Sequence, residues 1–323
     1  MIKTVENLKI KEIPGINLVE KELYELLQGS HENTYNICKR LITSGGKRIR
    51  PALVLSTAGC FGKVTKEAIQ ASAACECIHM ASLVHDDIID ESTMRRGTST
   101  VNDEKGNHTA VLVGDYLFAK AFEILSKNKL VKSMEVIVDA ISKMCDGEIF
   151  QSENLFNLDQ TREDYYHRIY QKTGVLIATC TQVGAITAGA DEEQIRAFRI
   201  YGENLGYAYQ IIDDILDFKG DEKILGKPVG SDLKEGNITL PILKLIQDKE
   251  YKDWIKKIIK KGDIEENYNQ ILRLLKESYA LEEAFGEAKN CVENAKQSLD
   301  CIEDSIYKDM LLNIANQVLT RKN

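Results

Sequence analysis

Apolar residues recur every three or four positions over most of the chain, and this spacing predicts long α-helices. No proline interrupts the pattern between Pro51 and Pro228, so helices there can continue for many turns. Alternating apolar and polar segments bounded by Asn-Gly or Asp-Gly turns do not appear, which argues against a sheet. The fold class expected is therefore all-α, with residues 1–323 forming a single domain.

Glycine and polar residues gather in three stretches that we expect to be loops, at 43–51, at about 91–109 and at 219–236. After Leu245 the chain becomes rich in Lys and Glu, with apolar residues at helical spacing between them. That pattern predicts peripheral helices that each keep one face in solvent.

The composition is that of an ordinary globular protein, with 43% hydrophobic and 28% charged residues. No apolar run approaches the roughly 18 residues that a membrane span requires. The first residues contain no apolar signal region, so we expect a cytoplasmic protein without a membrane span. A net charge of −8 argues against nucleic-acid binding, and eight scattered cysteines without a CxxC pair argue against zinc or disulfides.

Two aspartate motifs end or interrupt apolar helical segments. The segment 77–85 is apolar around most of its circumference and leads directly into Asp86 and Asp90, which lie four residues apart and so share a helix face. Asp213 and Asp217 repeat this spacing, with Gln210 one turn before them.

A single DDxxD motif is more often a solvated helix face than a binding site. Two carboxylates about 5 Å apart repel by roughly 3 kcal/mol at an effective dielectric constant of 20, and burial adds a further cost unless a cation neutralises them. We therefore expect the repeated motif to bind a cation. Oxygen ligands without Cys or His favour magnesium shared with substrate phosphates, so the sequence predicts a magnesium–diphosphate clamp.

Two clusters of cations flank the first aspartate motif in the sequence. The segment 45–51 contains Lys47 and Arg50 in a glycine loop ahead of a helix, and Arg95 and Arg96 follow shortly after the first motif. Glycines and helix N-termini favour anions, and the arginine fork suits phosphate. Either cluster alone would be read as a solvated surface run. His79, two turns before Asp86, is either a phosphate donor or a core histidine; the other four histidines favour the core interpretation.

Five motifs occur in one order along the chain: GGKRIRP at 45–51, IHMASLVHDDIID at 78–90 with RRG at 95–97, KTG at 172–174, YQIIDDILDF at 209–218 and GKPVGSDLKEGN at 226–237. Together they resemble the trans-polyprenyl diphosphate synthases. The resemblance implies an isoprenoid synthase helical bundle around a central cavity, active as a homodimer, which joins isopentenyl diphosphate to an allylic diphosphate such as farnesyl diphosphate with Mg²⁺.

The resemblance also implies roles for individual residues. The residues that bind isopentenyl diphosphate would be Lys47, Arg50, His79 and Arg96. The allylic diphosphate would be bound by Arg95, Lys172, Thr173, Gln210 and Lys227. Metal ligands would be Asp86, Asp90, Asp213 and Asp217, and the residues central to catalysis Asp86, Asp90, Lys172 and Asp213.

Small side chains precede the first motif by about one turn, at Ala81 and Ser82. Each CH₂ buried contributes about 0.8 kcal/mol, so an open path there favours longer products. In the family this pattern implies a C30–C40 product, with heptaprenyl the central expectation. Four alternatives stay open: a short-chain farnesyl or geranylgeranyl synthase, a catalytic chain that needs a small partner, a terpene cyclase, and a non-catalytic regulatory subunit. The intact second motif argues against the last two.

Overall fold

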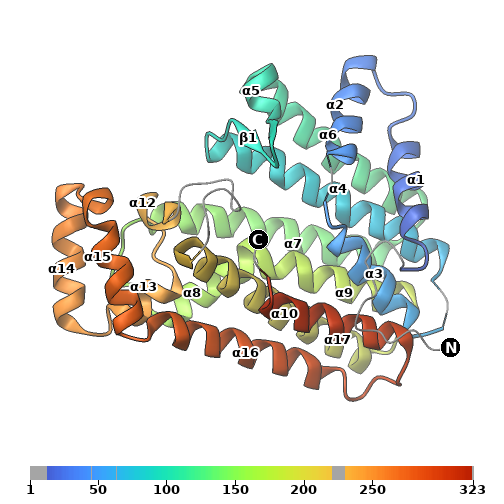
Figure 1. Ribbon diagram of the computed structural model, residues 1–323. Helices are drawn as coiled ribbons and strands as arrows, with labels where there is room; N and C mark the ends of the chain where they lie inside the picture. Colours follow the sequence, from blue (N-terminus) through green and yellow to red (C-terminus); the bar gives the residue numbers. More distant parts are fainter. Residues whose placement is uncertain (1–12, 45, 63, 220–229, 322–323) are drawn as a thin grey trace. The chain divides into compact units, whose positions relative to one another are not determined.

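The computed structural model describes residues 13–44, 46–62, 64–219 and 230–321, and these are almost entirely helical (Figure 1). The helices are α1 (Ile16–Leu26), α2 (Glu32–Thr43), α3 (Ile49–Gly59), α4 (Lys66–Ile89), α5 (Val101–Lys105), α6 (Asn107–Lys127), α7 (Val131–Glu153), α8 (Arg162–Ile169), α9 (Val175–Thr187), α10 (Glu192–Lys219), α12 (Ser231–Lys234), α13 (Leu240–Leu245), α14 (Lys249–Lys261), α15 (Ile264–Glu277), α16 (Ala280–Ser298) and α17 (Ile306–Leu319). The all-α prediction is confirmed.

The chain divides into two compact units, each assembled from three separate stretches. Unit 1 comprises 1–141, 176–199 and 299–313, and unit 2 comprises 142–175, 200–298 and 314–323. The helices α7, α9, α10 and α17 each contribute residues to both units. The single domain expected over 1–323 stays a prediction, and the two units are described separately below.

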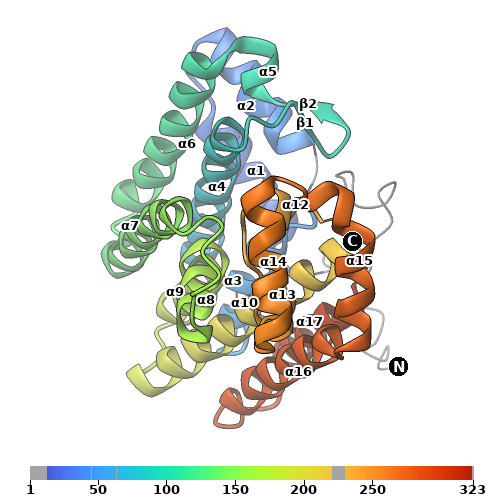
Figure 2. The ribbon, with the colours of Figure 1, turned by 90° about the vertical axis from the view of Figure 1, so that its left-hand side faces the viewer.

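Unit 1 is built around α4, which packs against α6, α3 and α1 (Figure 2). Alanines and other small residues of α4 are buried on all sides between 68 and 81, so this helix is a core helix without a solvent face. The Thr65 side chain starts the helix by accepting a hydrogen bond from Ala68 N at 3.1 Å. A rigid buried helix thus carries the first aspartate motif at its C-terminal end.

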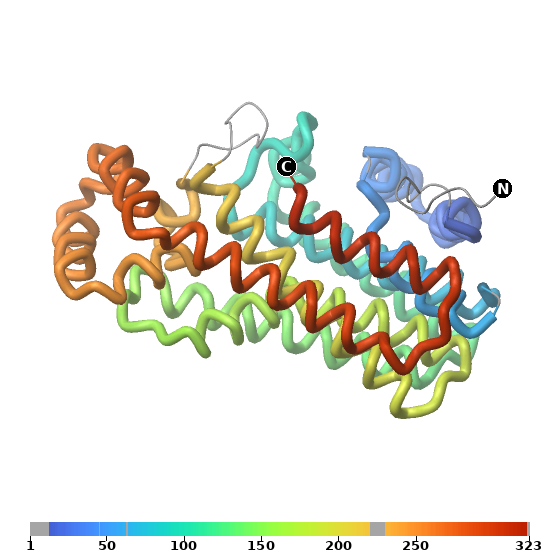
Figure 3. The backbone as a smooth tube through the Cα atoms, turned by 60° about the horizontal axis from the view of Figure 1, so that its bottom comes forward, coloured from blue at the N-terminus to red at the C-terminus, as the bar shows by residue number. Residues whose placement is uncertain are grey.

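Unit 2 contains the second motif on the later part of α10, and it also contains α12 to α16. Helix α13 packs against α15 and α16, and α14 lies beside α15 (Figure 3). The peripheral helices predicted after Leu245 are confirmed: α14 buries Ile255 and Ile258 and exposes most of its lysines.

The prediction of a loop over about 91–109 is wrong for the second half of this range, which is helical. A two-stranded antiparallel hairpin, β1 (Met94–Arg95) with β2 (Thr98–Ser99), is followed at once by α5 and α6. The Thr100 side chain caps α5 by accepting from Asp103 N at 3.4 Å, a helix start that the glycine-rich composition concealed. Among the described residues, no helix combines the length and apolar character needed to cross a membrane.

Candidate active site

The first aspartate motif lies at the end of α4, which stops at Ile89. Asp86 is half-buried, whereas Asp90 is exposed and follows the last helical residue. Its amide nitrogen donates to Asp86 O at 2.8 Å, which keeps the two residues one turn apart. The expectation that both carboxylates are buried is therefore wrong for Asp90, because the helix ends before the motif does.

Asp87, the middle one of the three aspartates in the motif, is the buried one, with 5% of its surface exposed. Arg95 Nε donates to Asp87 Oδ1 at 2.7 Å, and Asn102 Nδ2 donates to the Asp87 carbonyl at 3.1 Å. Burial raises the pKa of Asp87, and the Arg95 charge and hydrogen bond oppose that rise. The hairpin is thus tied to the motif. Arg95, predicted to bind the allylic diphosphate, is engaged here by a carboxylate, and its predicted role stays a prediction.

The two cationic clusters of unit 1 meet beside α4. A Cβ added at Gly46 would lie 3.1 Å from Arg96 Nη1, so the glycine lets the guanidinium approach the loop. Arg50 Nε is buried and has no hydrogen-bond partner among the described residues. Lys47 is exposed on the same loop. The structure therefore brings together the glycine loop and the RRG segment that the sequence placed far apart.

His79 lies within the positive potential of this cluster. Burial is the main cause that lowers its pKa well below the ordinary value, and the charges of Arg50, Arg96, Arg95 and Arg48 lower it further. The imidazole is therefore neutral at pH 7 and has one N–H to donate. Both interpretations of His79 left open by the sequence, core residue and phosphate donor, are compatible with this position.

In unit 2 the KTG element forms a π-helical turn over Tyr170–Gly174, between α8 and α9. Turns of this kind concentrate at functional sites. A Cβ added at Gly206 would lie 2.4 Å from Gly174 Cα, so two glycines let this turn contact α10 directly. Thr173 Oγ1 then donates to Gln210 Oε1 at 2.8 Å, and Lys172 Nζ lies 3.1 Å from Glu148 Oε2. The predicted residues Lys172, Thr173 and Gln210 are brought together.

The second motif has one exposed and two buried carboxylates. Asp213 has half of its side chain exposed, and Arg321 Nη2 lies 3.6 Å from its Oδ1. The Arg321 guanidinium also stacks 3.9 Å from the ring centroid of Tyr209. The C-terminal end of the described chain therefore provides a cation next to the motif.

Asp214 is buried and accepts hydrogen bonds from Tyr165 Oη at 2.7 Å and from Gln210 Nε2 at 2.9 Å. Burial, followed by the charge of Asp232, raises the pKa of Asp214 to about 7, although both hydrogen bonds oppose the shift. Through Gln210 this carboxylate is linked to Thr173. The middle aspartate therefore organises the side chains around the motif.

Asp217 is also buried, with 1% exposed, and accepts from Ser231 Oγ at 3.2 Å and from Asp232 N at 3.3 Å. Its carboxylate thus supports the start of α12. Asp213 and Asp217 are thus one turn apart on α10 but differ in environment, since Asp213 is exposed and Asp217 is buried. Lys227 lies outside the described residues.

The donor set of both motifs fits a hard divalent cation, since it consists of carboxylate oxygens without a thiolate or imidazole among the predicted ligands. Within the described ranges, no three or more Asp, Glu, His or Cys side chains are grouped so as to hold a metal ion. The predicted ligands Asp86, Asp90, Asp213 and Asp217 are distributed over the two units, and their shared role stays a prediction.

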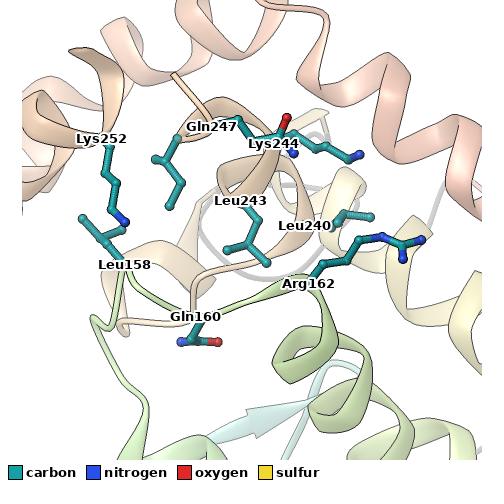
Figure 4. A pocket seen from close by; sticks show the side chains of 9 residues that line it. Leu158, Gln160, Arg162, Leu240, Leu243, Lys244, Gln247 and Lys252 are labelled. Atoms are coloured by element: carbon teal, nitrogen blue, oxygen red, sulfur yellow. The ribbon is translucent and has the colours of Figure 1, made fainter. Parts of the chain in front are cut away.

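A separate pocket of about 190 Å³ lies in unit 2 and contains none of the predicted site residues (Figure 4). Its three cations are already engaged: Arg162 and Lys244 both pair with Glu287, at 2.9 Å and 2.7 Å, and Lys252 pairs with Asp159 at 2.6 Å. Its lining residues are Leu158, Gln160, Arg162, Leu240, Leu243, Lys244, Ile246, Gln247 and Lys252.

Sequence reasoning assigned no role to several residues that shape the site, namely Glu76, Asp87, Tyr165, Asp214 and Arg321. A signal existed for Glu76, an acidic residue inside an apolar helical segment, and for the middle aspartates of the motifs. No local signal exists for Tyr165 or Arg321, because each reaches the second motif from a distant part of the chain.

An all-helical chain with two aspartate motifs, each beside cationic side chains, defines a prenyltransferase with the isoprenoid synthase fold. The chain belongs to the polyprenyl synthetase family, whose model matches residues 31–275. It is thus a polyprenyl diphosphate synthase, a transferase of isoprenoid biosynthesis.

Two relatives illustrate the range of products in the family. The chain is 36% identical to heptaprenyl diphosphate synthase component 2 of Bacillus subtilis, over 95% of this chain and 88% of that protein. It is 39% identical to a short chain isoprenyl diphosphate synthase of Methanothermobacter thermautotrophicus, over 90% of this chain and 91% of that protein. Similarity of this order identifies the reaction class and leaves the product length open.

Solved structures confirm the fold. A heptaprenyl diphosphate synthase from Staphylococcus aureus matches with a TM-score of 0.90 and 35% identity, covering 98% of this chain and 99% of that one. A polyprenyl synthase from Caulobacter crescentus, complexed with calcium and isoprenyl diphosphate, matches with a TM-score of 0.88 and 31% identity, covering 96% and 95%. Divalent metal and a prenyl diphosphate thus occur together in a relative.

Proposed function

We propose that this enzyme condenses isopentenyl diphosphate with an allylic diphosphate such as farnesyl diphosphate, with Mg²⁺, to give a C30–C40 polyprenyl diphosphate. The observation that carries the substrate assignment is the pair of cations Arg50 and Arg96, with neutral His79 beside them, next to the motif on α4. A diphosphate is a compact polyanion, and a buried guanidinium nitrogen without a partner is suited to bind one.

In this proposal Lys47, Arg50 and Arg96 bind the homoallylic diphosphate, and neutral His79 donates one hydrogen bond to it. Their fixed positions hold the double bond of the substrate in place and so lower the entropy cost of the condensation.

Lys172, Thr173 and Gln210 bind the allylic diphosphate, in our proposal together with Arg95 and Lys227. The π-helical turn and the Thr173–Gln210 hydrogen bond orient these donors before substrate arrives. Asp86, Asp90, Asp213 and Asp217 are the proposed holders of Mg²⁺. When bound, the metal neutralises charge on the diphosphate that leaves the allylic carbon.

The long-chain assignment is supported by the small residues on α4 before the motif. Ala81 contributes only a methyl group, and Ser82 Oγ donates to the His79 carbonyl at 3.0 Å. The serine hydroxyl is thereby satisfied within its own helix and presents no unpaired polar atom to an apolar chain. In our proposal a growing hydrocarbon chain passes α4 at these two small residues, where Ser82 offers it no unsatisfied donor.

The product length is tested with a graded series at one position, Ala81→Val and Ala81→Phe. Because bulk there shortens the available path, we expect the product mass to fall by one or more five-carbon units, with Phe shorter than Val. An unchanged product distribution in Ala81→Phe would show that the path is limited elsewhere. The Michaelis constant for isopentenyl diphosphate serves as the control that the diphosphate site is intact.

The reaction itself is tested with the purified chain, magnesium, labelled isopentenyl diphosphate and farnesyl diphosphate, followed by product mass. Absence of condensation, alone and with a candidate small partner chain, would contradict the proposal. The partner arm is included because one relative carries the name component 2. We further propose a homodimer, supported by the exposed Val111 and Leu112 on α6, and light scattering of the purified chain tests it.

A further inference from the structure

Arg48 lies between two proposed diphosphate ligands, Lys47 and Arg50, and itself has an unusual conformation. Its backbone has φ 50° and ψ 36°, in the left-handed region that residues other than glycine rarely adopt. A conformation of this kind persists only where the surroundings hold it. The contacts of the Arg48 side chain therefore determine how the loop enters α3, the helix that carries Arg50 in its first turn.

That side chain is 11% exposed and contacts three different helices. Nη1 donates to Glu76 Oε1 on α4 at 2.8 Å, and Nη2 donates to the Ile42 carbonyl on α2 at 2.5 Å. Nε lies 3.6 Å from Glu20 Oε1 on α1. The guanidinium thus fixes the loop against the elements around it, with its shortest carboxylate contact on α4.

Glu76 is the less expected partner, since its side chain is 5% exposed within the apolar part of α4. A buried carboxylate is costly without a cation, and removal of its partner leaves that cost uncompensated. Glu76 precedes His79 by three residues, about one helical turn. The ion pair therefore connects the glycine loop to α4 close to the level of the proposed phosphate donor.

We infer that the buried Arg48–Glu76 ion pair sets the position of Lys47 and Arg50 relative to His79, which makes Arg48 and Glu76 positioning residues for the homoallylic diphosphate. This inference rests on the proposed function, which assigns that diphosphate to this cluster. Arg48 is the residue from which α3 starts, and Arg50 lies in the first turn of α3. A shift of Arg48 consequently displaces Arg50, whose Nε is buried without a partner among the described residues.

The first test is Glu76→Gln in the full-length chain, which keeps the shape and removes the charge. We expect the Michaelis constant for isopentenyl diphosphate to rise about tenfold, while kcat and the Michaelis constant for farnesyl diphosphate stay within about twofold. The allylic constant is the internal reference, because three of its proposed ligands, Lys172, Thr173 and Gln210, belong to unit 2, away from the Arg48–Glu76 pair in sequence and in unit. An equal rise in both constants, or none in either, would overturn the inference.

Two further variants separate positioning from stability. The double variant Arg48→Met with Glu76→Met leaves no buried charge unpaired, so we expect a melting temperature near that of the wild type but a Michaelis constant for isopentenyl diphosphate that stays raised. The matched control is Arg40→Met, which removes a peripheral ion pair with Glu104 in the same unit and should change neither constant. Wild-type kinetics in a stable double variant would show that the pair is structural only.

A binding measurement keeps the inference independent of turnover. Calorimetric titration of the chain with inorganic pyrophosphate, with EDTA present, reports on the cationic cluster without metal. We expect about tenfold weaker binding in Glu76→Gln than in the wild type, and equal binding would overturn the inference. A wild type that binds pyrophosphate but forms no product would contradict the proposed function and leave this comparison valid.

Discussion

The two aspartate motifs have the same spacing but different surroundings. On α4 the middle aspartate, Asp87, is neutralised by a cation, Arg95, and the helix ends before Asp90. On α10 the middle aspartate, Asp214, is held by the neutral donors Tyr165 and Gln210, and the helix continues past the motif. Spacing therefore specifies which residues share a helix face, while the end of the helix and the neighbouring chain decide which carboxylates are exposed.

The largest effect on turnover is expected for two single variants, each of which removes an exposed or half-buried carboxylate from one of the motifs. Asp86→Ala and Asp213→Ala each remove a proposed metal ligand, and we expect kcat to fall by about a thousandfold, or ~4 kcal/mol of transition-state stabilisation. Melting temperature should change little because neither side chain is in the core. Near-normal turnover in both variants, measured with saturating magnesium, would contradict the clamp.

Removal of the middle aspartates, Asp87 and Asp214, tests whether the two motifs differ in how their buried carboxylate is held. Asp214→Ala leaves Tyr165 and Gln210 without their acceptor in the core and should cost about 2–4 kcal/mol of unfolding free energy. Asp87→Ala leaves Arg95, which is about a third exposed, to be solvated and should cost about 1–2 kcal/mol. Urea denaturation of both variants gives the order, and a larger loss in Asp87→Ala would reverse our interpretation.

The contact between Gly206 of α10 and Gly174 of the π-helical turn is tested with a matched pair of helical substitutions. Gly206→Ala places a methyl group 2.4 Å from Gly174 Cα, so the π-helical turn must shift, at about 1–3 kcal/mol. Gly286→Ala in α16 meets no atom within 4 Å and should stabilise by about 0.5–1 kcal/mol through helix propensity. Equal effects of the two substitutions on the melting temperature would mean that the Gly206–Gly174 contact tolerates added volume.

The smallest effect is expected for Glu287, whose contribution to the free energy of unfolding should depend on pH. Burial would raise the pKa of Glu287, but hydrogen bonds from Arg162, Lys244 and Tyr166 outweigh burial and lower it. A lowered folded-state pKa means that the stabilisation is present above the unfolded-state value of about 4.3 and is lost as the pH falls through the folded-state value.

Glu287→Gln should therefore cost roughly 1 kcal/mol of unfolding free energy at pH 7 and less below about pH 4. The matched control is Glu283→Gln, which removes a mostly exposed carboxylate 3.7 Å from Lys244 and should have little effect at any pH. If the difference in unfolding free energy between Glu287→Gln and the wild type stayed the same below about pH 4, a lowered pKa of Glu287 would be contradicted.

Much of the fold follows from local patterns, and less of the site does. The long apolar repeats predicted α4 and α10, and the spacing of the aspartates predicted which ones share a face. The Asp87–Arg95 pair depends on the hairpin that reverses the chain after α4, which no helical periodicity encodes. The approach of Arg321 to Asp213 depends on tertiary packing of the last helix, so only a three-dimensional structure could provide it.

The π-helical turn over Tyr170–Gly174 also has a consequence for anyone who redesigns this chain. A π-helical turn closes its hydrogen bonds over one residue more than an α-helical turn does, so the helical phase advances by about 100° across it. The residues of α8 and α9 consequently do not belong to one continuous helical wheel, although they are contiguous in sequence. Repeat-based sequence design should treat Gly174 as a phase boundary and count positions afresh from Val175.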